Sequence, residues 1–359
     1  MDDAESFDRN DQGADPGYPA PVNAAMTTEP AISLNAVRKT FGKKVAVQGI
    51  DLLVPKGELV GFIGPNGAGK TTTIRMIMSI LFPDSGELRV LGKKSAIESK
   101  DRIGYLPEER GVYKKMKVGH FLRHMGRLKG LSPNGIDDKI RHWLEKVELP
   151  GVWNKRCEEL SKGMQQKVQF VSCVLHEPEL LILDEVFSGL DPVNMRLLRN
   201  LIREENERGT TIIFSTHVMA QAQEICDHVI MIHNGEKVLD DPVRAIRDRY
   251  APNAVWFEPM QDTGFDASVV ESVHAVESVS RVDGTYRAML ADGTDPSLAV
   301  ASVAGAAPMS RVELHRPTLE DIFIDIVQGG GSGDDAETLR AALREGGAGL
   351  DTEPEGVTP

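Results

Sequence analysis

Lys70 and Thr71 end a short glycine-rich run whose residue types could bind the phosphates of a nucleotide. The run is Gly64-Pro65-Asn66-Gly67-Ala68-Gly69-Lys70-Thr71, and Thr72 follows it as a further candidate contact. Glycines let successive backbone N–H groups converge on one anion, because no side chain obstructs the approach. The Lys70 ammonium could then reach the β- and γ-phosphates, and the Thr71 hydroxyl could coordinate Mg²⁺. The run therefore predicts binding of a nucleoside triphosphate.

The segments on either side of this run have the patterns that a phosphate-binding loop requires. Leu59–Ile63 is an apolar run typical of a buried parallel strand, and Thr72–Leu81 carries apolar residues at helical spacing. A helix that begins at the loop adds unsatisfied N–H donors and the positive end of its dipole. The alternative, an ordinary glycine-rich turn, would not require this order of strand, loop and helix, so we favour phosphate binding.

Two carboxylates follow a second apolar run, Leu180–Leu183. Four consecutive aliphatic residues predict a central parallel strand that delivers Asp184 and Glu185 at its carboxyl end. In a phosphate-loop fold, Asp184 would hold Mg²⁺ through water and Glu185 would polarise an attacking water molecule. Paired buried carboxylates would be costly without a cation, which argues against a purely structural role. The strand predicted at 210–214 should bring His217 to the same edge.

Two other positions could contact a nucleotide. Ser161 and Gly163 place a hydroxyl and an open backbone at the start of a predicted helix, which is a second possible anion site. Phe41 lies upstream of the phosphate loop, where its ring could stack on an adenine. A hydrophobic plug in a β layer is an equally good interpretation of Phe41, and both remain open here.

Length and composition restrict the class of protein. A chain of 359 residues has room for one large domain and a smaller one, and 41% hydrophobic with 5% aromatic residues suits an α/β protein. The sequence has no run of eighteen apolar residues, so it predicts no membrane-spanning helix. The acidic N-terminus argues against secretion. Three cysteines without C-x-x-C spacing indicate neither a disulfide framework nor a zinc site, so a reducing cytoplasm fits.

The net charge of −13 is concentrated at the two ends of the chain. Residues 1–30 have seven acidic side chains and one basic one, and residues 329–359 have seven and two, which leaves 40 acidic and 38 basic residues between them. We expect a disordered leader at 1–30 and a flexible acidic tail at 329–359, because neither has much to bury. No basic cluster is large enough to predict nucleic-acid binding.

The interval between the glycine-rich run and the second carboxylate strand predicts a helical subdomain at about 109–177. His120 and His124 lie four residues apart in it, but no carboxylate with ligand spacing follows, so we expect surface or packing histidines. A basic stretch there has two interpretations that stay open: a solvated helix face, or a docking face for the cytoplasmic loops of a membrane partner. Its basic residues are Lys114, Lys115, Lys117, Arg123, Arg127 and Lys129.

Taken in order, these motifs resemble the ATP-binding subunit of an ABC transporter over residues 31–245. The glycine-rich run is similar to the Walker A loop, and Leu180–Asp184 resembles the Walker B strand. The resemblance makes Glu185 the catalytic carboxylate, with His217 and Lys70 also in catalytic roles. The remaining matches are the D-loop at Ser188–Asp191, the switch histidine His217 and the adenine-stacking Phe41.

The chain departs from the family pattern at two places. Leu160–Gln165 resembles the signature motif, with Lys162 and Met164 in place of a glycine and the glutamine. Ser161 and Gly163 remain, and the resemblance implies that they contact the γ-phosphate of a nucleotide held by the opposite subunit. Glu108 stands where the family usually has glutamine; its carboxylate could still ligate Mg²⁺ or hold the lytic water, so we expect hydrolysis to survive.

The resemblance implies an α/β fold with a P-loop NTPase core of the ABC ATPase type at 31–246, with an antiparallel β subdomain and the inserted helical subdomain. A small C-terminal α+β domain at 247–328 resembles the accessory domain of exporter ATPases related to sodium- and drug-extrusion systems. The implied function is Mg²⁺-ATP hydrolysis that powers export through a separate permease chain. The implied assembly is an ATP-dependent homodimer, peripheral on the inner face of the cell membrane.

Two other functions occur in the same superfamily. A soluble translation factor acting on ribosomes would usually carry two nucleotide cassettes, and this chain has one loop of that kind. A DNA-repair or chromosome ATPase would insert a long coiled coil between the glycine-rich run and the signature, and the interval from Thr71 to Leu160 is too short for one. Both are therefore less favoured than transport.

Overall fold

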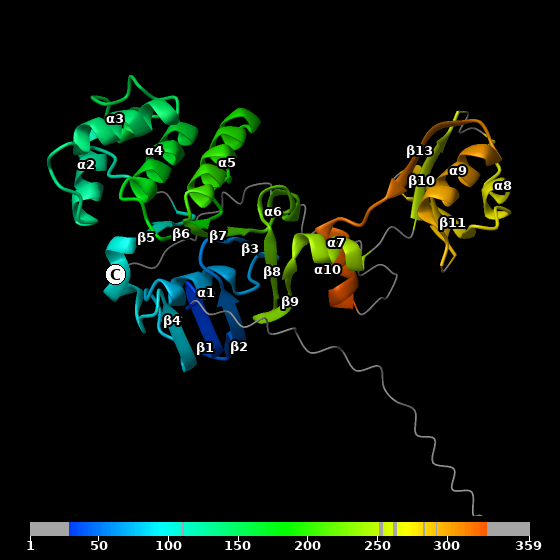
Figure 1. The fold of residues 1–359 in the computed structure, drawn as a ribbon, viewed down its shortest axis with the longest axis horizontal. Coiled ribbons are helices and arrows are strands. Elements are labelled where there is room, and N and C mark those ends of the chain that lie inside the picture. The colour runs from blue at the N-terminus through cyan, green and yellow to red at the C-terminus, as the bar shows by residue number, and fades with distance from the viewer. Residues whose placement is uncertain are drawn as a thin grey trace, which may run out of the picture.

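The computed structural model describes most of the chain between the two acidic ends (Figure 1). The predicted acidic tail and nearly all of the predicted leader lie outside the described residues. The described ranges are 29–109, 111–250, 254–260, 264–282, 284–291 and 293–328.

A six-stranded sheet forms the centre of the molecule. All its neighbouring strands are parallel except the last pair, which is antiparallel. The phosphate loop follows the fourth strand. The third strand, its neighbour, leads into His217, and the second strand ends in Asp184. The order is β5 (Ile103–Leu106), β6 (Leu180–Asp184), β7 (Thr211–Thr216), β3 (Leu59–Ile63), β8 (His228–His233) and β9 (Glu236–Pro242).

Alternate residues of these strands enter two different cores. Val60 and Phe62 of β3 contact the first helix and an antiparallel sheet, whereas Leu59 and Ile63 join the core that packs against the other helices. A parallel strand covered on both faces is apolar throughout, which is why β3 and β6 are continuous apolar runs in the sequence. The antiparallel sheet has the order β2 (Lys44–Val54), β1 (Ile32–Phe41) and β4 (Ser85–Val90).

The first helix, α1, spans Lys70–Ile77 and begins at the end of the phosphate loop. We expected it to continue to Leu81, and that expectation was wrong. Ser79 adopts a left-handed conformation with φ +55°, which ends the regular helix. The N–H groups of Ile80 and Leu81 both bond to the carbonyl of Arg75 instead.

The helical subdomain packs on the opposite side of the central sheet from α1 (Figure 1). Its helices cover Phe170 and Trp143, which meet edge to face at a ring separation of 6.3 Å. Further helices flank the sheet and connect its strands. The helices of the subdomain and those that flank the sheet are, in chain order, η1 (Ala96–Arg102), α2 (Val118–Leu128), α3 (Ile136–Lys146), η2 (Cys157–Glu159), α4 (Lys162–Val174), α5 (Pro192–Glu207), α6 (Met219–Ile225) and α7 (Val243–Arg249).

The C-terminal elements form a separate four-stranded antiparallel sheet with its own core, which Figure 1 places away from the central sheet. Its strand β11 exposes Glu277 and Ser278 side by side, which hides the apolar alternation expected of a half-buried strand. The order is β11 (Val276–Val282), β12 (Thr285–Leu290), β10 (Ala254–Pro259) and β13 (Met309–His315), with helices α8 (Ser268–Glu271) and α9 (Pro296–Ala306).

The last described helix, α10 (Leu319–Gln328), returns from this small sheet to the ATPase core. Leu319, Ile322 and Phe323 are buried there, and α10 contacts α6. The region expected to form one accessory unit at 247–328 therefore packs in two places. Its expected start also differs, because 247 lies inside α7 rather than between elements.

Candidate functional site

The phosphate loop is held open by two glycines in conformations that other residues rarely adopt. Gly64 has φ +151°, and a Cβ atom there would lie 2.1 Å from the carbonyl oxygen of Ile232. Gly69 has φ +111°, and its Cβ would lie 2.5 Å from the carbonyl oxygen of Ala46. Both positions therefore require glycine on steric grounds as well as for backbone approach to a ligand.

The Lys70 ammonium is folded back onto its own loop. Its Nζ donates to the carbonyl oxygens of Gly64 at 2.7 Å and Pro65 at 3.2 Å. Burial lowers the pKa of Lys70, and the negative charges of Glu185 and Asp184 oppose that shift. A phosphate group in the loop would supply a counter-charge for this buried cation.

A cavity of about 300 Å³ opens above the loop. Phe41 lies at its edge with 48% of its surface exposed, so it is not the buried hydrophobic plug that was one interpretation of the sequence. Most of the predicted nucleotide contacts line this cavity, together with Lys44 and Ala46, which sequence reasoning missed. The predicted residues among its lining are Phe41, Asn66, Gly67, Gly69, Lys70, Thr71, Thr72, Glu108 and Glu185. Ala68 is buried beneath the loop.

Asp184 ends β6 next to β7 and is buried. Its Oδ1 accepts a 2.7 Å hydrogen bond from the hydroxyl of Ser215, a residue to which the sequence assigned no role. Its Oδ2 is buried without a hydrogen-bond partner among the described residues. Burial raises the pKa of Asp184, and the nearby charge of Glu185 raises it further.

This donor set fits a magnesium ion. An orphaned carboxylate oxygen and the Thr71 hydroxyl are hard oxygen ligands of the kind that Mg²⁺ prefers. Within the described part of the chain, no group of three or more His, Cys, Asp or Glu side chains could hold a metal by itself.

Glu185 and His217 form a closely bonded pair. The Glu185 Oε1 accepts hydrogen bonds from the His217 backbone N–H at 2.9 Å and from its Nδ1 at 2.8 Å. The bond to Glu185 raises the pKa of His217 despite partial burial of the ring. Glu185 itself has φ +50°, a strained conformation for a residue with a side chain. Its carboxylate is thus fixed at the cavity wall by the strand that carries His217.

Glu108 lies at the mouth of the same cavity, just beyond the end of β5. Partial burial raises the pKa of Glu108, and the charges of Asp184 and Glu185 add to that effect. Tyr105 on β5 is also affected, since burial raises its pKa to about 12. Several carboxylates therefore lie close together at one site, and a bound cation would offset their repulsion.

Ser161 and Gly163 do not line this cavity. Ser161 is exposed and caps α4, its hydroxyl accepting the N–H of Met164 at 3.3 Å. Gly163 lies near Asn194, whose side chain is bonded to Asp191, the N-cap of α5. The predicted site residues thus fall into two groups on one subunit, one around Lys70 and one around Ser161.

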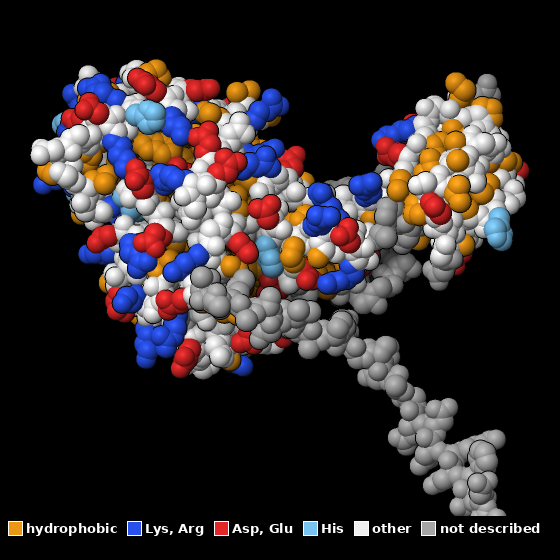
Figure 2. Space-filling view, viewed as in Figure 1, with side chains coloured by type: hydrophobic (Ala, Val, Ile, Leu, Met, Phe, Trp, Pro, Cys, Tyr) orange, Lys and Arg blue, Asp and Glu red, His pale blue; other side chains and the backbone are white. Residues whose placement is uncertain are grey.

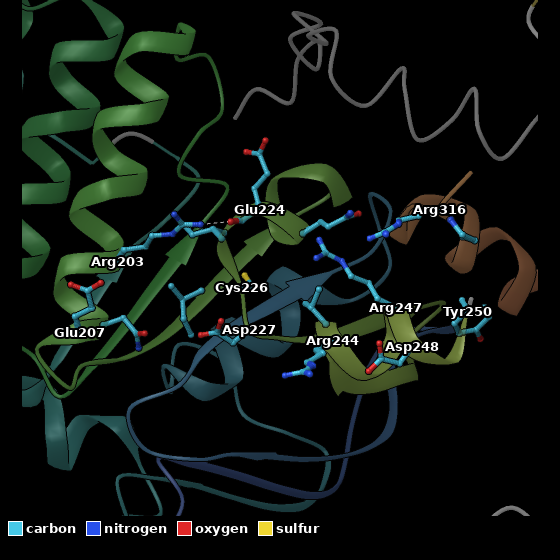
Figure 3. A pocket seen from close by; sticks show the side chains of 16 residues that line it. Arg203, Glu207, Glu224, Cys226, Asp227, Arg244, Arg247, Asp248, Tyr250 and Arg316 are labelled. Carbon is cyan, nitrogen blue, oxygen red and sulfur yellow. Dashed lines mark hydrogen bonds between the residues drawn. The ribbon is translucent and has the colours of Figure 1, made fainter. Parts of the chain in front are cut away.

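A larger hollow than the loop cavity lies elsewhere, among α5, α6 and α7 (Figure 3). It measures about 1240 Å³, and Arg316 and Pro317 from the connection to α10 complete its wall. Arginines and carboxylates both line it, and Arg203 donates to the backbone carbonyl of Glu224. It lacks converging glycine N–H groups, so its size does not make it the nucleotide site.

Comparisons with known protein families agree with this geometry. A family described as ABC transporter matches residues 47–188, and a family described as the C-terminal domain of ATP-binding proteins like DrrA1-3 matches residues 242–327.

Similar full-length proteins carry transport names. The chain is 38% identical over 82% of its length to the uncharacterized ABC transporter ATP-binding protein YhaQ of Bacillus subtilis, covering 98% of that protein. It is 31% identical over 82% of its length to a Nod factor export ATP-binding protein of Rhizobium, covering 96% of it. It is 30% identical over 85% of its length to a bacitracin transport ATP-binding protein of Enterococcus faecalis, covering 99%.

Solved structures give the same answer for the fold. The ATP-binding subunit of an ABC transporter superposes with a TM-score of 0.57 and 29% identity, covering 61% of this chain and 93% of that one.

Proposed function

The chain belongs to the family of ABC transporter ATP-binding proteins, which are ATPases, and from this premise we propose that it powers export through a separate membrane permease. The observation that carries the proposal is the meeting of three neighbouring strand ends at one cavity. There β3 supplies the phosphate loop and β6 leads into Glu185 at the cavity wall, while Asp184 at the end of β6 and His217 after β7 lie directly beside Glu185. Phosphate binding, charge neutralisation and water activation are thereby combined in one place.

The residues around the cavity divide the work of ATP hydrolysis. The loop N–H groups and Lys70 bind the phosphates, and Phe41 stacks on the adenine. Glu185 accepts a proton from the attacking water molecule. The oxygen of that water bonds to the γ-phosphorus, and ADP departs as the leaving group. Its other oxygen has no hydrogen bond to a described residue, which leaves it available to that water. His217 holds the Glu185 carboxylate in position. Mg²⁺, when bound, offsets the charge of the phosphates.

Thr71 and Asp184 would hold this ion, with Glu108 beside them. The support is chemical: the three side chains offer oxygen atoms, and Asp184 has one oxygen with no partner among the described residues. Ser215 keeps Asp184 oriented toward the cavity through its 2.7 Å hydrogen bond. In this arrangement Glu108 either ligates the metal or hydrogen-bonds the lytic water.

The second group of site residues completes the cavity of another subunit. Ser161, Gly163 and Asp191 are near one another in the fold, and neither Ser161 nor Gly163 lines the cavity of its own chain. In a head-to-tail homodimer, the Ser161 hydroxyl and the start of α4 would face the γ-phosphate bound to the partner's loop. ATP would then join the subunits and hydrolysis would release them, which is the differential binding that can drive a permease.

The relatives of this chain support a role in transport. Two similar proteins are named for Nod factor export and bacitracin transport. No helix of the described residues is long and apolar enough to cross a bilayer. On this proposal, the chain acts at the inner face of the cell membrane and a permease on another chain provides the pathway.

The catalytic assignment is tested with Glu185→Gln. The amide keeps the shape of the side chain but cannot accept the proton, so turnover should fall by about 10³-fold or more while ATP binding persists. Steady-state ATPase assays and equilibrium binding of a fluorescent ATP analogue measure the two quantities. A variant that still hydrolyses ATP at the wild-type rate would refute the assignment.

The transport assignment is tested by isolating the tagged full-length chain from membranes of its native host. An integral membrane protein should co-purify in a stoichiometric amount. Deletion of the gene for that membrane protein should release the ATPase from the membrane fraction. Recovery with ribosomes or DNA instead of a membrane protein would overturn the transport proposal while leaving the ATPase assignment intact.

A further inference from the structure

One end of the helical subdomain carries a run of basic side chains. Between residues 111 and 136 the sequence has six Lys or Arg side chains and no Asp or Glu. The exposed members of this stretch form the basic face. They come from the loop before α2 and from one side of α2. They are Lys114, Lys115, Lys117, His120, His124 and Arg127.

The other two cations of the stretch are already occupied. Arg123 makes a bidentate ion pair with Asp137, with distances of 2.8 and 2.6 Å. The Nζ of Lys129 is directed inward and donates to the backbone carbonyls of Lys100 and Ile103. By contrast, none of the basic-face side chains makes an ion pair with a described residue. Four Lys or Arg charges thus remain available to an external partner.

The loop and the helix form one continuous surface. The ring of Tyr113 lies 6.0 Å from that of Phe121 and 6.1 Å from that of His124, which holds the lysine loop against α2. A shallow hollow of about 440 Å³ runs along the exposed side of α2. Figure 2 shows basic and histidine side chains on the end of the molecule where Figure 1 places α2 and α3. The charges therefore act together on a ligand larger than a single ion.

Two exposed apolar side chains border the basic face. Tyr113 exposes 54% of its surface and Leu128 exposes 58%. A lipid surface accepts both kinds of side chain, since its phosphate charges meet the basic groups and its apolar region meets these two. Tyrosine in particular favours the boundary between headgroups and acyl chains.

We propose that the basic face binds the anionic headgroups of a phospholipid bilayer directly, independently of any permease. The proposal goes beyond ATP hydrolysis and transport, because it gives the ATPase its own contact with the membrane. General attraction is excluded as the source, since the whole chain carries a net charge of −13 and would be repelled by an anionic surface. Only a local cluster can overcome that repulsion, and it acts within about 10 Å of the lipid at moderate salt.

The test uses the purified full-length chain and vesicles that contain no permease. Co-sedimentation should occur with vesicles of phosphatidylcholine mixed with phosphatidylglycerol and not with phosphatidylcholine alone. Binding should disappear as salt is raised to about 0.5 M, because the headgroup charges are then screened. Equal binding to both kinds of vesicle would refute the proposal.

A triple variant locates the contact. Lys114→Ala, Lys115→Ala and Lys117→Ala together should weaken vesicle binding by about 100-fold, since each lysine near an anionic surface contributes about fivefold. A matched control removes three exposed lysines elsewhere, with Lys93→Ala, Lys94→Ala and Lys100→Ala, and should retain binding within about threefold. Basal ATPase activity should be unchanged in both, which shows that both are folded.

Three results would overturn the proposal. The first is that the triple variant binds as tightly as the wild type. The second is that variant and control lose binding equally, which would mean that only net charge matters. The third is that the chain binds RNA or polyaspartate at a salt concentration where it does not bind anionic vesicles, which would make the basic face a site for soluble polyanions.

Discussion

The buried carboxylate of Asp184 lowers the stability of the fold unless a bound ligand compensates its charge. Its carboxylate is buried, and one of its oxygens has no partner among the described residues. Because burial raises its folded-state pKa above the ordinary value of 3.8, its contribution to stability is present below that value and is lost as the pH rises through the folded pKa. At pH values above the ordinary one, Asp184 therefore contributes a cost to the ligand-free fold.

Asp184→Asn should relieve that cost. We expect the ligand-free variant to melt about 2 °C higher than the wild type at pH 7.5, the size of shift that about 1 kcal/mol gives in a large domain. The two proteins should converge as the pH is lowered toward the ordinary value of 3.8, because the difference in stability arises only above it. Added Mg²⁺ and ATP should stabilise the wild type more than the variant. Differential scanning calorimetry measures these shifts, and a lower melting temperature at pH 7.5 would contradict the argument.

Glu108 has a different role from Glu185, although both carboxylates line the same cavity. Glu185 is fixed by two hydrogen bonds from His217, whereas Glu108 lies at the exposed mouth. We expect Glu108→Gln to keep ATPase activity within about tenfold, because an amide oxygen can also ligate Mg²⁺ or hold water. Its demand for Mg²⁺ should rise, since one charge is lost. A metal titration of the ATPase rate measures both, and a loss equal to that of Glu185→Gln would disprove the separation of roles.

At the scale of elements, α10 is the helix whose position the sequence did not reveal. Its apolar residues repeat at helical spacing, so the helix itself follows from the pattern. The spacing does not say which surface those residues cover. The structure places Phe323 beside His233 at the end of β8, with ring centroids 5.5 Å apart, and bonds the Leu319 N–H to Gln223 of α6.

Two buried phenylalanines test the assignment of α10 to the ATPase core. Phe323 lies in the ATPase core and Phe257 lies in the small C-terminal sheet, and both are fully buried. Truncation of a buried phenylalanine to alanine costs about 3–5 kcal/mol in the unit that contains it. Phe323→Ala should therefore speed amide hydrogen exchange in α6 and β8, and Phe257→Ala should speed it in β10 and β12. The reverse pattern would place α10 in the C-terminal unit.

The sequence predicted those parts of the fold whose information is local. The run from Gly64 to Thr71 and the strand that ends in Asp184 were visible because glycine, lysine and carboxylate positions are fixed by short-range geometry. The end of α1 was not visible, because the left-handed turn at Ser79 lies in a residue without a strong preference for it. The hydrogen bond from Ser215 to Asp184 depends on the pairing of β6 with β7, which no local pattern specifies.

At the scale of the whole molecule, the division of site residues into two groups predicts complementation between damaged chains. Lys70→Ala removes the phosphate contact from one group, and Ser161→Arg blocks the other. In a head-to-tail dimer of the two variants, one site has both defects and the other has neither. Each variant alone should be inactive, whereas an equal mixture should recover about a quarter of the wild-type rate, because half of random dimers are mixed and half of their sites are intact.

ATPase assays on the separate and mixed variants measure this recovery, and denatured chain serves as the control for added protein. The chosen substitutions leave Glu185 in place on both chains, so the intact site of a mixed dimer keeps its proton acceptor. No recovery in the mixture, with both variants folded and binding to each other, would mean that each chain completes its own site.

The return of α10 to the core also sets the order in which the protein can be finished during translation. α10 begins 70 residues after α7 ends, and the small sheet lies between them in the sequence. At usual rates of synthesis, roughly 4–14 s pass before the ribosome has made the helix that covers this part of the core. During that interval the surface awaiting Leu319, Ile322 and Phe323 stays uncovered. A stop codon ahead of α10 would therefore leave that surface uncovered, although Lys70, Asp184 and Glu185 would already have been made.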